Sequence, residues 1–68
     1  MYRILEIDGV IRAWICKDNK ADLYGEPKEW KTLEDASAWV KRHTYKGMSH
    51  EYVIFSLYSD GIWEEVKI

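Results

Sequence analysis

The sequence predicts an α+β domain of order ββαββ, in which two hairpins form a four-stranded sheet and one helix packs on one face. Three observations lead to this fold: two Asp-Gly dipeptides between strand-forming residues, one helical run with start and stop signals, and a length of 68 residues. At this length two separate cores would each be too small, so we expect a single domain over 1–68.

The first hairpin is predicted by Asp8-Gly9, which lies between two runs rich in branched apolar residues. Asp-Gly is typical of two-residue type I′ turns, because both central residues of that turn need a positive φ. We therefore expect strands over 2–7 and 10–17, with Ile7 opposite Val10.

Residues 18–31 separate this hairpin from the helix. The segment contains Gly25 and Pro27 and has no clear hydrophobic period. We expect an irregular connection, with a short extra strand at 21–24 as the alternative.

The helix is predicted to begin after Thr32, since Asp35 three residues later resembles a capping box. Basic residues gather toward the other end, and Gly47 can adopt a left-handed capping conformation. We expect the helix to span 33–45. The side chains at helical spacing are Leu33, Ala36, Val40 and His43.

The second hairpin is predicted by Asp60-Gly61, with strands over 51–59 and 62–68 and Ser59 opposite Ile62. The first and third strands are the most apolar, which favours central positions for them. The expected sheet order is therefore 2-1-3-4.

Alternation along the strands predicts two faces. The face under the helix is expected to carry Tyr2, Ile4, Ile11, Ala13, Ile15, Val53, Phe55, Leu57, Ile62, Val66 and Ile68. The opposite face is expected to carry Arg3, Leu5, Ile7, Val10, Arg12, Trp14, Cys16, Tyr52, Ile54, Ser56, Tyr58, Trp63, Glu65 and Lys67.

The opposite face holds more apolar and aromatic residues than a sheet face that meets only water. Four groups could cover this face: the 18–31 connection, the stems of its own Arg and Lys side chains, a second copy of the chain, or an external partner. We favour a non-enzymatic interaction module that forms a homodimer or binds a protein partner through this face. The expected partner-binding residues are Arg3, Arg12, Trp14, Tyr52, Tyr58 and Trp63.

Single-stranded nucleic acid is the alternative ligand, because exposed aromatic rings beside Arg can stack bases and neutralise phosphates. The net charge of −2 and the absence of a readable RNP-type motif make this the less favoured hypothesis.

No pattern in the sequence indicates catalysis, a metal or a cofactor. His43, His50 and the lone Cys16 lack zinc-ligand spacing, and Glu64 and Glu65 point to opposite faces of a strand. No glycine-rich phosphate loop is present. We expect no catalytic residue, no bound metal and no cofactor.

The longest run without a charged residue is 52–59, far short of the roughly 20 residues of a membrane-spanning helix. Charged residues also interrupt the first dozen positions, unlike a secretory signal. We expect no membrane span and a cytoplasmic location.

The segment 30–36, together with Trp39, is similar to the strand-to-helix transition in the amino-terminal arm-binding domains of phage integrases. Those domains place three strands before the helix and are usually basic, so the resemblance implies no function. In size, mixed charge and layout the chain resembles phage and prophage accessory proteins, which often bind and modulate a host protein.

Overall fold

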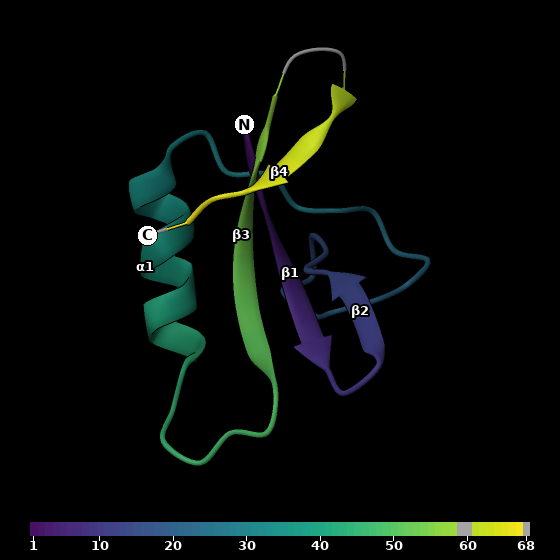
Figure 1. The fold of residues 1–68 in the computed structure, drawn as a ribbon, viewed down its shortest axis with the longest axis vertical. Helices are drawn as coiled ribbons and strands as arrows, with labels where there is room; N and C mark the ends of the chain where they lie inside the picture. The colour runs from purple at the N-terminus through teal and green to yellow at the C-terminus, as the bar shows by residue number, and fades with distance from the viewer. Residues whose placement is uncertain (59–60, 68) are drawn as a thin grey trace.

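The computed structural model describes residues 1–58 and 61–67, and these form the predicted ββαββ order. The elements are β1 (Tyr2–Asp8), β2 (Ile11–Trp14), α1 (Leu33–His43), β3 (Glu51–Leu57) and β4 (Trp63–Glu65). The sheet is antiparallel with the order β2-β1-β3-β4, which confirms both the α+β class and the predicted central strands. Figure 1 shows α1 beside β3, away from β2. At 11 residues, α1 is too short to cross a bilayer, and no other α-helix occurs among the described residues.

The first hairpin turns one residue later than predicted. Asp8 pairs with Ile11, so Gly9 and Val10 are the central turn residues, and the predicted pair of Ile7 with Val10 is wrong. Gly9 has φ +64° and Val10 has no positive φ, as in a type II′ turn, which spares the β-branched residue a strained conformation. The pairing has moved by two positions, so each side chain keeps its predicted face.

The second hairpin differs from the prediction by a single position. Leu57 pairs with Trp63, and the Tyr58 amide donates to the Ile62 carbonyl at 2.7 Å. Three residues separate Tyr58 from Ile62, and the last of them, Gly61, has φ +77°. A one-residue offset reverses the faces of β4 relative to β3. The remaining predictions for Ser59, Asp60 and Ile68 lie outside the described residues.

The pairing of β1 with β3 decides which side of β3 the helix covers. Ile4 pairs with Ile54 and Leu5 with Val53, so the even-numbered residues of both strands share one face. Ile54 is buried in the core cluster under α1, and Tyr52 packs against that cluster. The prediction that the helix covers Val53, Phe55 and Leu57 is therefore wrong. Because β3 carries apolar residues on both of its faces, its sequence alone does not indicate which face is buried.

Val66 is on the helix side as predicted, because two errors cancel. The predicted face of β3 was reversed, and so was the predicted orientation of β4 relative to β3. Its amide donates to the Ile54 carbonyl at 2.8 Å, and its side chain packs against the core cluster. The chain after β4 runs toward α1 (Figure 1).

The start of α1 is as predicted and its end is earlier. The Thr32 hydroxyl accepts a hydrogen bond from the Asp35 amide at 3.1 Å, which caps the helix. The helix ends at His43 rather than 45, since Thr44 is extended and its hydroxyl donates to the Val40 carbonyl at 2.6 Å. The Thr44 hydroxyl thus gives a carbonyl of the last turn a hydrogen-bond donor. Gly47, with φ +88°, lies beyond the end of the helix.

Trp39 lies at the centre of the core, although the predicted apolar face of the helix did not include it. Its ring stacks on His43 at 3.8 Å and meets Trp30 and Tyr52 edge to face at 5.9 and 5.1 Å. Its indole nitrogen donates to Asn19 Oδ1 at 3.3 Å. The buried cluster comprises Ile4, Ile15, Trp30, Ala36, Trp39 and Ile54.

The 18–31 connection is irregular, as predicted, but it contains no strand at 21–24. It touches the sheet through single pairs: Ala21 with Ile15, Pro27 with Cys16, and Trp30 with Tyr2. Trp30 thereby lies beside the start of β1, where β2 no longer pairs with it. The connection follows the β2 edge of the sheet, and its Tyr24 is 95% exposed.

Candidate interaction surface

The sheet face opposite α1, here called the outer face, is built by the odd-numbered residues of β1, β3 and β4 and the even-numbered residues of β2. Its apolar side chains are Leu5, Ile7, Trp14, Val53, Phe55, Leu57 and Trp63. None of them is buried, and Leu57 is 41% exposed. Among residues 1–58 and 61–67, no helix or second sheet covers the outer face, which therefore presents an apolar surface.

Aromatic rings gather at one end of the outer face. The Trp14 ring meets Phe55 edge to face at 5.3 Å and lies 5.9 Å from Trp63. The Arg3 guanidinium lies 4.3 Å from the centre of the Trp63 ring and 5.4 Å from that of Trp14. These contacts hold the rings together and cover part of them within the chain.

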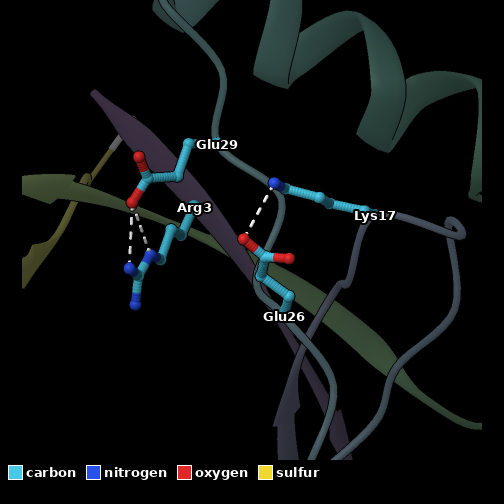
Figure 2. Close-up of polar contacts among 4 residues, drawn as sticks. All are labelled: Arg3, Lys17, Glu26 and Glu29. Atoms are coloured by element: carbon cyan, nitrogen blue, oxygen red, sulfur yellow. Dashed lines mark hydrogen bonds and ion pairs between the residues drawn. The ribbon is translucent and has the colours of Figure 1, made fainter.

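Arg3 is also fixed by an acidic residue from the connection. Its Nε donates to Glu29 Oε2 at 3.0 Å, and its Nη2 forms an ion pair with the same oxygen at 2.9 Å, beside the more exposed Lys17–Glu26 pair (Figure 2). Exposed pairs such as Lys17–Glu26 contribute little to stability. The Arg3 pair has a different consequence, since it neutralises the positive charge closest to the aromatic rings.

The structure brings together three of the six predicted site residues and separates the others. Arg3, Trp14 and Trp63 form the cluster just described. Arg12 is on the outer face, exposed and opposite Ile7. Tyr52 was placed on the wrong face, since it packs under the helix.

The predicted register, with Ser59 opposite Ile62, would also place Tyr58 opposite Trp63. This is wrong, because Trp63 pairs with Leu57. Tyr58 follows the end of β3 and is 61% exposed. Sequence reasoning in turn missed Val53 and Phe55 on the outer face. The β1–β3 register that places them joins distant parts of the chain and left no local signal.

A separate polar cluster lies at the other end of β1, on the helix side. The Tyr52 hydroxyl lies 3.0 Å from His50 Nε2, and that nitrogen is 3.7 Å from Glu6 Oε1. Burial, then the Glu6 carboxylate, raises the pKa of Tyr52, so its phenol stays protonated at neutral pH. The cluster joins the loop after α1 to the sheet, since His50 precedes β3 and Glu6 lies on β1.

By its even number Cys16 would continue the outer face beyond β2, but its side chain is buried under the connection. Its thiol lies within hydrogen-bonding distance of the carbonyls of Trp14 and Asp22, at 3.4 and 3.5 Å. Burial raises the pKa of the Cys16 thiol, and the charges of Asp22 and Asp18 raise it further. The thiolate needed for nucleophilic or metal chemistry is therefore disfavoured.

The described residues contain no group of three or more His, Cys, Asp or Glu side chains arranged to hold a metal ion. Comparison with known proteins gives no further guidance: no protein-family model, curated protein or solved structure matches the chain.

Proposed function

We propose that this chain is a non-enzymatic interaction module that binds a protein partner, either a second copy of itself or another protein, through the outer face. The observation that carries the proposal is the row of partly exposed apolar side chains on β1 and β3, the two strands at the centre of the sheet. Contiguous apolar patches of this kind mark association sites on small proteins. The helix face shows that the same strands can be fully covered when a layer is present.

The aromatic cluster supports a protein ligand. Trp and Arg are enriched at the energetic centres of protein interfaces. Trp14, Trp63 and Arg3 are already packed against one another, so binding would order few additional rotamers. We propose these three residues as anchors, with Arg12 at the margin.

Nucleic acid is less well supported as the ligand. Arg3 is paired with Glu29, and Glu51 and Glu65 belong to the outer face. A phosphate backbone would meet these carboxylates, and the chain as a whole carries a net charge of −2. A protein surface tolerates such mixed charge.

The cellular setting is part of the proposal. A single unpaired cysteine suits a reducing compartment, and we propose a cytoplasmic role. A small binding protein of this kind could act as phage-type accessory proteins do, by attaching to another protein and changing its activity.

Site-specific photo-crosslinking tests the proposal. Val53 on the outer face is replaced by benzoylphenylalanine, and Ala38 on the exposed side of α1 is replaced in a matched control. In cells that express the chain, we expect a discrete protein adduct from position 53 and none from position 38. No adduct at position 53, or the same adducts at both positions, would overturn the proposal.

The same variant distinguishes the nucleic-acid alternative. A purified position-53 variant is irradiated with labelled single-stranded DNA at low and high salt. Adducts that form only at low salt would favour nucleic acid, because phosphate contacts weaken steeply as salt rises. We expect no such adducts.

A further inference from the structure

Resting on the proposed function, we propose that the outer face binds a second copy of this chain, packed face to face about a two-fold axis that runs along β1. In this dimer Arg12 of each copy lies opposite Glu51 of the other. The partner class is thus the chain itself rather than an unrelated protein.

The first support is the charge pattern on either side of β1. Ile7 pairs with Arg12 on β2 and with Glu51 on β3, so an apolar residue separates opposite charges in one row of the sheet. Both charged residues are exposed. Neither forms an ion pair with any residue in 1–58 or 61–67.

A two-fold axis along β1 exchanges the positions of β2 and β3 between the two copies. It therefore brings Arg12 over the partner's Glu51, and by symmetry Glu51 over the partner's Arg12. A single patch becomes complementary to itself, which is the requirement of an isologous interface. Ile7 lies on the axis and meets its own copy.

The next row of the sheet fits the same operation. Leu5 pairs with Trp14 on β2 and with Val53 on β3. The axis brings the large Trp14 ring over the smaller side chain of the partner's Val53. A large residue thus faces a small one twice, as interdigitating sheets require.

Arg3 also lies near the axis, and the two copies of Arg3 would approach each other. Each guanidinium is already paired with Glu29 at 2.9 Å and stacked on Trp63. The approaching groups are therefore neutral ion pairs rather than bare charges.

Charge reversal gives a sharp test by sedimentation equilibrium over a concentration series. We expect the natural chain to reach twice its mass of 8.1 kDa. R12E and E51R, tested separately, each place like charges opposite one another at both symmetric positions, which should raise the dimer Kd about tenfold or more. An equimolar mixture of the two variants should associate as a heterodimer, since every facing pair is again of opposite charge.

The double variant R12E/E51R serves as the matched control, because it restores both pairs within one chain type and should dimerise like the natural chain. Thermal unfolding of each variant checks the fold, which these exposed positions should not disturb. A natural chain that dimerises while the mixture stays monomeric would overturn this proposal, since the interface must then lie elsewhere.

The outcome also separates this inference from the proposed function. A monomeric natural chain, together with a position-53 adduct to a different protein, would overturn the second copy and leave the outer face as a binding surface. A monomeric chain without any adduct would overturn both. An adduct of twice the chain mass from position 53 supports both.

Discussion

The two faces of the sheet use the same strands, yet in the part of the chain that the structure describes only one of them has a helix over it. Ile4 and Ile54 are buried at 0% and 5% exposure, while their immediate neighbours Leu5 and Val53 are partly exposed. Both faces carry large apolar side chains. Burial is therefore decided by what packs over the strand: α1 and Trp30 on one side, and on the other mainly the side chains of the outer face, with Glu29 of the connection on Arg3.

The cover differs in kind as well as in amount. On the helix face Trp39 contacts three rings, two of them from other segments, and is 2% exposed. On the outer face Trp63 is only partly exposed and has the Arg3 guanidinium over its ring. The first arrangement stabilises the fold, and the second leaves ring surface available to a ligand.

Truncating the two tryptophans should separate these roles most strongly. Trp39→Ala removes the centre of the core, and we expect a loss of about 3–5 kcal/mol, enough to unfold most of so small a chain. Trp63→Ala should cost about 1 kcal/mol and weaken association instead. Urea unfolding and sedimentation measure the two effects. Equal losses of stability would show that the outer face also belongs to the core.

Neighbouring positions on β1 give a finer comparison. Ile4→Ala should cost about 2–4 kcal/mol, because its side chain is fully buried. Leu5→Ala removes a similar volume from the outer face and should cost about 1 kcal/mol in the monomer. Urea midpoints of the two variants, at concentrations low enough to keep the chain monomeric, decide this. A Leu5→Ala effect as large as that of Ile4→Ala would contradict the contrast between the faces.

Gly25 lies against Cys16, which belongs to the outer face by alternation and is nevertheless buried. A Cβ at Gly25 would lie 2.7 Å from Cys16 Sγ and 3.2 Å from the Asp22 Cβ. Gly25→Ala should therefore cost about 1–3 kcal/mol through overpacking.

Cys16→Ala removes the sulfur and should reduce the cost of Gly25→Ala by at least about 0.5 kcal/mol in a double-mutant cycle. Additive effects in urea unfolding would mean that the connection does not press on Cys16.

The smallest change in stability is expected in alkaline solution, where one group from each face, Cys16 and Tyr52, loses a proton. Cys16 and Tyr52 have pKa values raised in the folded chain, so the unfolded chain loses these protons first. Stability should fall as pH rises above about 8.5 through Cys16 and above about 10 through Tyr52.

Cys16→Ala should remove the first decline and Tyr52→Phe the second, measured as urea midpoints between about pH 7 and 11. A first decline that persists in Cys16→Ala would assign it to another group.

Local chemistry predicted much of this fold. The helix start at Thr32 follows from side-chain capping, and the central positions of β1 and β3 follow from their apolar composition. The faces of the first hairpin were also predictable, since an error of two positions in the pairing does not change them.

The candidate surface was less predictable, for a physical reason. The side of β3 that faces α1 is set by its pairing with β1, in which Ile4 meets Ile54 across most of the chain. Trp39 lies three residues after Ala36 and four before His43, so helical spacing was compatible with its burial. The predicted apolar stripe omitted it, and its large ring was the missed signal for the core.

The central position of β1 also bears on how the chain reaches its native state. β1 can pair with β2 as soon as the first hairpin exists, but a lone hairpin is only marginally stable in water. Its other edge has no partner until β3 arrives from the far end of the sequence, and such distant pairing slows folding. During synthesis the first hairpin must therefore wait with one edge of β1 unpaired until β3 has been made.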